Sequence, residues 1–224
     1  MTDPVRIANC SGFFGDRVSA AREMVEGGPI DVLTGDWLAE LTMLILARIR
    51  AKRPGQGFAG TFVTQMEQVM GQCLDRGIKV VANAGGLDPA GCAEAVQQVA
   101  DRLGLRPTIA YVTGDDLLQR LTDLAESGAL QPFDPGAVPP VLGDSLRSPS
   151  RPPGAQHDSG RGTSPAGSGA VGDVSEYLTA NAYLGCWGIV EALTRGADIV
   201  ITGRVTDAAV VIGPAAWHHG WARD

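Results

Sequence analysis

The feature that most constrains the fold of this chain is a repeated unit, in which a short apolar run ends in a small polar turn and a helical pattern follows. The apolar runs that begin the five copies are 5–8, 30–33, 78–82, 108–112 and 198–201. Repetition of strand, turn and helix favours parallel strands, because each crossover helix returns the chain to the same end of the sheet. We therefore predict an α/β fold with a mostly parallel, Rossmann-like, doubly wound sheet and helices on both faces.

Apolar residues at intervals of three and four predict the helices between these runs. Asp88 followed by Pro89 is typical of a helix start, because the Asp side chain caps free amides and proline loses no bond at the first helical position. The spacing predicts helices over residues 17–26, 37–52, 58–76, 89–103, 117–127 and 177–193, and a short one from 208 to 213.

Composition excludes two classes of partner. The formal net charge is -7, and no cluster of Lys and Arg interleaved with aromatic residues occurs, so nucleic acid is not an expected partner. The first residues lack the basic and then apolar profile of a signal peptide, and the apolar run 38–49 is interrupted by Glu40, Thr42 and Arg48. We expect a cytoplasmic protein with no membrane partner, and the sequence leaves the formation of a homo-oligomer open.

The four cysteines are interpreted as reduced thiols. Cys10, Cys73, Cys92 and Cys186 are widely spaced and form no CxxC pair, which indicates neither a zinc site nor a disulfide framework. The sequence identifies no cofactor.

The domain organisation follows from one change in composition. Residues 129–174 are rich in Pro, Gly and Ser, a composition that cannot bury enough apolar surface to offset the ordering of the chain. We predict an α/β domain over 1–128, a disordered insertion or linker over 129–174, and the continuation of the α/β domain over 175–224.

The polar turns that follow the apolar runs predict a binding site. In a parallel sheet all such turns lie at the carboxyl edge, and ligands of open α/β sheets bind in the crevice there. The candidate ligand-binding residues, all in these turns, are Asn9, Ser11, Gly12, Gly15, Asn83, Gly85, Gly86, Gly114, Asp116, Gly203 and Arg204. Their spacing matches neither the dinucleotide-binding motif nor the P-loop.

An Asp after a Gly at the head of a helix has two interpretations. It caps the helix, which we favour for Asp36, Asp88 and Asp116, or it contributes to a site. Asp16, Asp115 and Asp207 are the candidate catalytic residues, as acid/base groups or as ligands of a divalent metal, with capping as the alternative. Arg204 can fork onto a phosphate or carboxylate, or pair with a neighbouring Asp.

Cys10 and the histidines are weaker candidates. A thiol in a loop that opens a helix can be a nucleophile, but no partner for Cys10 is visible, so we interpret it as buried and structural. His157 lies in the expected insertion, and His218 and His219 lie near the end of the chain, where we expect surface residues.

Six blocks in these turns and helices together resemble the N-terminal domain of the acyclic terpene utilisation AtuA family. The resemblance covers residues 5–127 and 177–224, and the chain ends where the family domain continues, so we expect an incomplete domain. The blocks are residues 9–17, 34–42, 83–87, 114–116, 180–185 and 201–207.

The resemblance implies a role in bacterial breakdown of citronellol- and geraniol-type terpenes through acyl-CoA intermediates, alongside a geranyl-CoA carboxylase. We therefore expect an enzyme or enzyme component that binds a small anionic metabolite, such as an acyl-CoA. The alternative is a non-catalytic scaffold or regulatory partner of acyl-CoA carboxylase subunits.

Overall fold

The computed structural model describes residues 3–130 and 177–223. The chain divides into two compact units, one formed by Met1–Leu118 with Leu178–Asp224 and the other by Gln119–Tyr177. The second unit contains α5 (Leu121–Glu126), and the short 3-10 helix η1 (Leu118–Arg120) lies where the units meet in sequence. The insertion expected at 129–174 lies almost entirely outside the described residues, so it stays a prediction.

The first unit is built on a five-stranded sheet in which every neighbouring pair is parallel. This confirms the predicted α/β fold. Since the strands are parallel, the turns that follow them lie at one carboxyl edge. In spatial order the strands are β1 (Ile7–Asn9), β2 (Val32–Gly35), β3 (Lys79–Ala82), β5 (Ile199–Thr202) and β4 (Ile109–Val112).

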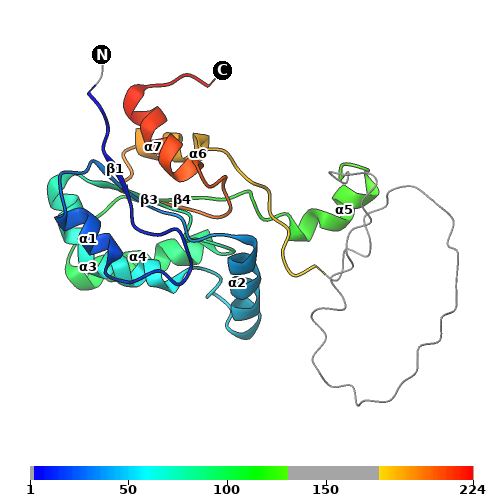
Figure 1. Ribbon diagram of the computed structural model, residues 1–224. Helices are drawn as coiled ribbons and strands as arrows, with labels where there is room; N and C mark the ends of the chain where they lie inside the picture. The colour runs from blue at the N-terminus through cyan, green and yellow to red at the C-terminus, as the bar shows by residue number, and fades with distance from the viewer. Residues whose placement is uncertain (1–2, 131–176, 224) are drawn as a thin grey trace, which may run out of the picture. The chain divides into compact units, whose positions relative to one another are not determined.

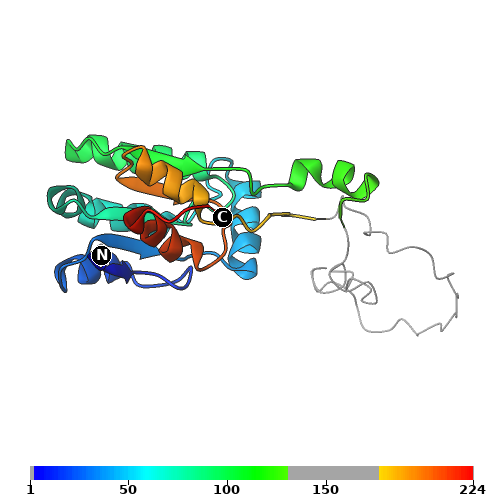
Figure 2. The ribbon, with the colours of Figure 1, turned by 90° about the horizontal axis from the view of Figure 1, so that it is seen from above.

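Helices cover both faces of this sheet (Figure 1). Alternate strand residues face opposite sides, so Val80 joins one core cluster and Val81 the other. One face carries α1 (Ala20–Glu26), α3 (Gly60–Arg76) and α4 (Pro89–Leu103), and the other carries α6 (Trp187–Thr194) and α7 (Ala209–His219). Seen from above, α6 in orange and α7 in red lie over the strands (Figure 2).

The strand order creates a topological switch point between β3 and β5. The chain leaves β3 through α4 on one face, reaches β4 at the sheet edge, and returns through α6 on the other face to place β5 beside β3. It then leaves β5 through α7, again on the second face. Connections that diverge to opposite faces open a crevice at the carboxyl ends of the two strands.

Helix α2 (Glu40–Lys52) stands at one end of the sheet in both views (Figures 1 and 2). Residues at each of its ends contact carboxyl-edge loops. Glu40 reaches Arg204, and the Arg50 guanidinium donates to the Leu87 carbonyl at 3.2 Å. The helix therefore crosses the edge at which the predicted site lies.

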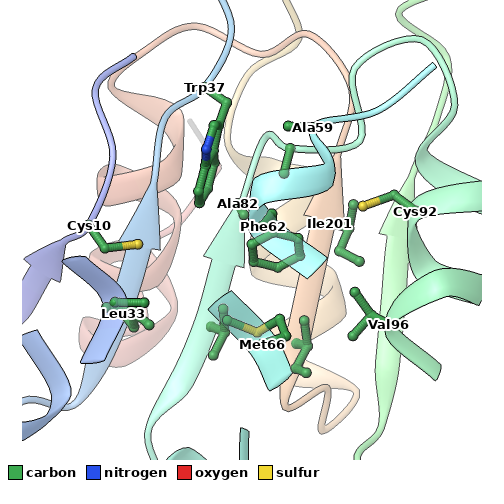
Figure 3. Close-up of a cluster of buried hydrophobic side chains, with 14 of the residues drawn as sticks. Cys10, Leu33, Trp37, Ala59, Phe62, Met66, Ala82, Cys92, Val96 and Ile201 are labelled. Carbon is green, nitrogen blue, oxygen red and sulfur yellow. The ribbon is translucent and has the colours of Figure 1, made fainter. Parts of the chain in front are cut away.

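The larger core cluster lies under α1, α3 and α4 (Figure 3). Phe62 and Met66 of α3 are fully buried in it, as the hydrophobic spacing predicts, and the Phe62 ring packs edge-on against Trp37 with 5.3 Å between ring centroids. The Cys10 side chain is directed into the same cluster as Leu33. The β1–α1 loop is thus anchored by apolar burial.

The last two helices that the sequence predicts are wrong in extent. The helix expected over 177–193 is confined to α6, and residues 178–186, here called the return segment, are not helical and form two isolated β-bridges, at Asn181 and Leu184. Its backbone bonds to distant loops, since Ala182 N donates to the Asp115 carbonyl at 2.7 Å and Thr206 N to the Leu184 carbonyl at 2.9 Å. These partners, together with Gly185, outweigh local helix propensity.

The last helix does not end at Gly213 as expected, and α7 continues through Pro214 to His219. Proline inside a helix removes a backbone bond, but Ala216 is buried and Trp217 packs against the second core cluster beyond it. Burial of that turn maintains the helix. Among the described residues, no helix combines the length and apolarity needed to cross a membrane.

Candidate functional site

Asn83, the first residue after β3, joins two carboxyl-edge loops. It is fully buried; its side-chain oxygen accepts from the Trp37 amide at 2.7 Å, and its amide group donates to Asp36. Asp36 also accepts from the Leu38 amide at 3.3 Å, and burial raises its pKa. Ala39, whose side chain makes no cap bond, is the residue before α2, so capping of this helix by Asp36 is wrong.

Gly85 lies at the switch point itself. Its amide donates to the Thr202 carbonyl at 3.0 Å, and a Cβ added to it would lie 2.6 Å from that oxygen and 2.8 Å from Pro89 Cα. Close approach of β3 and β5 therefore accounts for the glycine. Gly86 follows with a φ of 54°, and its amide donates to the Asn83 carbonyl at 3.3 Å. Ligand binding by Gly85 and Gly86 stays a prediction.

Asp115, which follows Gly114 at the end of β4, is a buried carboxylate with internal partners. One oxygen accepts from the Arg204 amide at 2.7 Å and from the Asn181 side chain at 2.9 Å, and only 3% of the residue is exposed. A Cβ on Gly203 would lie 2.5 Å from both carboxylate oxygens, so glycine makes room for the group. Burial raises the Asp115 pKa.

Arg204 is a buried cation at the same switch point, with a guanidinium group that donates to the Leu38 carbonyl and, at 2.8 Å, to the Tyr183 hydroxyl. Two carboxylates neutralise it, Glu40 at 3.2 Å and Asp207 at 3.7 Å. The Arg204 side chain is 5% exposed, whereas those of Glu40 and Asp207 are 80% and 71% exposed. A buried guanidinium is thus held by carboxylates that reach solvent.

Tyr183 of the return segment contacts both Arg204 and Glu40. Its ring centre lies 4.4 Å from the Arg204 guanidinium carbon, and its hydroxyl donates to Glu40. That hydrogen bond is the main reason why the pKa of Glu40 is lowered, with the Arg204 charge adding to it.

Asp116 and Asp88 act as local caps. Asp88 accepts the Gly91 amide at 2.9 Å at the start of α4, which confirms the predicted cap. Asp116 accepts the Leu118 amide at 3.0 Å and lies 3.6 Å from the Arg50 guanidinium. The cap interpretation of Asp116 therefore has a partner, and its ligand role stays a prediction.

The β1–α1 loop forms a separate small pocket of about 170 Å³. Asp16 closes the loop on itself, accepting the Gly12 amide at 2.8 Å and the Ser11 hydroxyl at 3.4 Å. Asn9 donates to the Ser11 carbonyl at 2.9 Å, and a Cβ on Gly15 would meet the Phe13 ring. The Asp36 amide, which donates to the Ser11 carbonyl at 2.9 Å, joins this loop to its neighbour.

The structure thus divides the predicted site into two groups along one edge. The group at or beside the switch point comprises Asn83, Gly85, Gly86, Gly203, Arg204, Asp207 and Asp115, with Gly114 and Asp116 flanking Asp115. The group in the β1 loop comprises Asn9, Ser11, Gly12, Gly15 and Asp16. Helix α1 begins only at Ala20, later than the predicted 17, because loop bonds occupy the preceding residues.

The model of the family described as "Acyclic terpene utilisation family protein AtuA" matches residues 5–224. The chain belongs to the AtuA family. This confirms the resemblance that the six sequence blocks indicate. No curated protein and no solved structure matches the chain.

Four residues of this AtuA-family site are absent from the candidates that turn positions indicate. Asp36, Glu40, Asn181 and Tyr183 all contact Arg204, Asp115 or Asn83 directly. Asp36 and Glu40 lie in block 34–42, and Asn181 and Tyr183 lie in block 180–185. The blocks that carry the family resemblance are therefore the sequence feature that could identify these four residues.

The acidic residues of these loops are also candidate ligands of a divalent metal. Among the described residues, no three His, Cys, Asp or Glu side chains gather closely enough to hold a metal ion. Of the histidines, His218 contacts the Asp3 carbonyl at 2.8 Å. It lies at the C-terminal end of α7, whereas Asp207 precedes the N-terminal end of that helix. His157 is outside the described residues.

Cys10 fits the structural interpretation. Its thiol is buried, 3.7 Å from the Gln65 side-chain oxygen, and burial raises its pKa to about 12. A thiol with so high a pKa holds little thiolate near neutral pH and is a poor nucleophile.

Iodoacetamide at pH 8 is expected to modify Cys186 first and to leave Cys10, Cys73 and Cys92 unmodified in the folded protein. Cys186 is half-buried, whereas the other three thiols are buried, which raises the pKa of each. Mass spectrometry of peptides, with a urea-unfolded sample in which all four react, measures this. Rapid modification of Cys10 in the folded protein would contradict it.

Proposed function

We propose that this chain binds an anionic metabolite of acyclic terpene catabolism, such as a branched acyl-CoA, at the carboxyl edge of its sheet. The observation that carries the proposal is Arg204, a buried guanidinium at a topological switch point whose carboxylate partners are exposed. The side chains of Glu40 and Asp207 reach solvent, so they can turn away from Arg204 when another anion replaces them on the buried guanidinium. A ligand carboxylate or phosphate then takes their place on a planar donor suited to it.

Acid/base chemistry belongs to the same proposal. Asp207 is the exposed carboxylate beside Arg204, and Asp36 is a half-buried carboxyl whose pKa burial raises, which favours proton transfer nearer neutral pH. Asp115 is covered and positions the Arg204 backbone. The amides of Gly85 and Gly86 already bind carbonyls, so the guanidinium is the anion donor that we assign.

Calorimetric titration of the chain with branched acyl-CoA esters, free CoA and the free acids tests this proposal. Arg204→Gln is expected to weaken ester binding at least about tenfold, since hydrogen bonds to charged groups contribute roughly 1.5–3 kcal/mol. Arg102→Gln, which removes an exposed cation paired with Glu67, is the matched control and leaves binding unchanged. Absence of heat with every ester, or equal binding by both variants, would refute the proposal.

A second candidate is a non-catalytic role as partner of an acyl-CoA carboxylase in the cytoplasm. Two adjacent apolar side chains on α7, Val211 and Ile212, are 41% and 44% exposed, which suits a protein interface. Co-purification with carboxylase subunits that survives Arg204→Gln but not Ile212→Asp would favour this role. Light scattering of the chain alone reports whether the same surface supports a homo-oligomer.

A further inference from the structure

A second, larger pocket of about 640 Å³ lies at the far end of α2. This volume is within the range of roughly 300–1,000 Å³ typical of small-molecule sites. The residues that line it come from the β1–α1 loop, the end of α2, the segment that follows, α3 and α4: Phe14, Ile49, Lys52, Arg53, Gln56, Phe58, Gly60, Val63, Thr64 and Ala95.

The walls of this pocket are apolar and anchored. Phe14, Ile49, Phe58 and Val63 are each partly buried and pack against the larger core cluster. Their remaining surface faces the pocket from four separate parts of the chain. Such a wall favours an aliphatic group, whose burial removes apolar surface from water on both sides.

The charged residues of the pocket are all positive. Lys52 and Arg53 are exposed, enter no ion pair among the described residues, and face no acidic neighbour among the described lining residues. Cations at the end of a helix also complement its dipole. Arg50 of the same turn, in contrast, donates to the Leu87 carbonyl and lies 3.6 Å from Asp116, so Lys52 and Arg53 are the cations of this helix end that remain available to a ligand.

We propose that this pocket binds an amphipathic carboxylate, a small molecule with an aliphatic body and one anionic end. The aliphatic body contacts Phe58 and Val63, and the carboxylate lies between Lys52 and Arg53. The site goes beyond the one proposed around Arg204. Glu40, which contacts Arg204, begins α2 and Lys52 ends it, and at 1.5 Å per residue these positions are about 18 Å apart.

Decanoate is the probe for the test, with decanol as the same chain without charge and acetate as the charge without the chain. Titration followed by amide NMR is expected to shift signals of residues 49–64 with decanoate, less with decanol, and not with acetate. Lys52→Gln and Arg53→Gln each weaken decanoate binding by about threefold to fivefold, the effect of an exposed charge pair. Arg48→Gln, on the same helix but outside the pocket, is the matched control and leaves binding unchanged.

Val63→Trp fills the pocket and is expected to abolish decanoate binding, while Arg204→Gln leaves it intact. Because Lys52 and Arg53 are exposed, their variants keep the test valid even if Val63→Trp unfolds. Equal effects of Arg53→Gln and Arg48→Gln, or signal shifts confined to residues near Arg204, would overturn the proposal. If the wild-type chain binds decanoate but gives no heat with any acyl-CoA ester, only the function proposed above is refuted.

Discussion

Replacing Gly85 with alanine is expected to lower the free energy of unfolding by about 3 kcal/mol, near the upper end for overpacking a tight site. The added Cβ would meet the Thr202 carbonyl at 2.6 Å and Pro89 Cα at 2.8 Å. Both are backbone atoms, which cannot rotate away as a flexible side chain can. The β3 and β5 ends must therefore separate, and the bond from Gly85 N to Thr202 is lost.

Urea unfolding followed by circular dichroism measures this change. Gly71→Ala is the matched control, since Gly71 lies inside α3 and a Cβ there meets only Leu105, at 4.0 Å. That variant is expected to gain about 0.5–1 kcal/mol from the higher helix propensity of alanine. If both variants changed stability alike, close packing of the switch point would not explain Gly85.

Separation of β3 from β5 also predicts a functional effect of Gly85→Ala. Arg204 follows β5 by two residues, and Asn83 follows β3 directly, so a shift between these strands displaces both sides of the proposed site. Under conditions in which Gly85→Ala is still folded, we expect this variant to bind acyl-CoA more weakly than the wild type does. Gly71→Ala leaves binding unchanged.

The sheet and its carboxyl edge could be predicted because their signals are local. The apolar run 78–82 between Gly77 and Asn83 predicts the bounds of β3 to within one residue. The Asp88–Pro89 pair predicts the first residue of α4. Parallel pairing then follows from the alternation of strands and helices, which brings the turns to one edge without any knowledge of side-chain contacts.

The return segment could not be predicted in this way, because what holds it is distant in sequence. Ala180, Ala182 and Leu184 favour a helix locally, but their backbone groups bond to residues 115–117 and 204–206. Tyr183 is placed over Arg204 only through that pairing. The spacing of apolar residues along 177–193 carries no information about this pairing with distant loops.

Two roles at the site depend on burial and therefore escaped sequence reasoning. Asp36 and Asp88 each come shortly before a helix, but Asp88 lies directly before α4 and caps it, whereas residues 37–39 separate Asp36 from α2 and its carboxylate contacts buried Asn83. Glu40 reaches Arg204 because α2 crosses the sheet edge, a packing arrangement that periodicity does not encode.

Asp115→Ala is expected to cost roughly 2 kcal/mol of stability at pH 7. The carboxylate accepts from the Arg204 amide and the Asn181 side chain, and a donor left unpaired in a buried site costs about 1–3 kcal/mol. Relief of the buried charge offsets part of this cost. Asp75→Ala is the control, because Asp75 is exposed on α3 and its side chain has no hydrogen bond or ion pair among the described residues, and it is expected to change stability by less than about 0.5 kcal/mol.

Asp115→Asn separates the hydrogen bonds from the charge. Because burial raises the pKa of Asp115, the folded state holds this proton more tightly than the unfolded state. The buried charge therefore costs stability as pH rises above the usual Asp pKa of about 4, until the raised pKa is passed. Asn keeps an acceptor and never ionises, so its stability relative to wild type should increase from about pH 4 to pH 7. Urea unfolding at a series of pH values measures the difference in free energy of unfolding between Asp115→Asn and the wild type. If this difference stays constant or decreases from about pH 4 to pH 7, the fold stabilises the carboxylate form of Asp115 and the prediction is wrong.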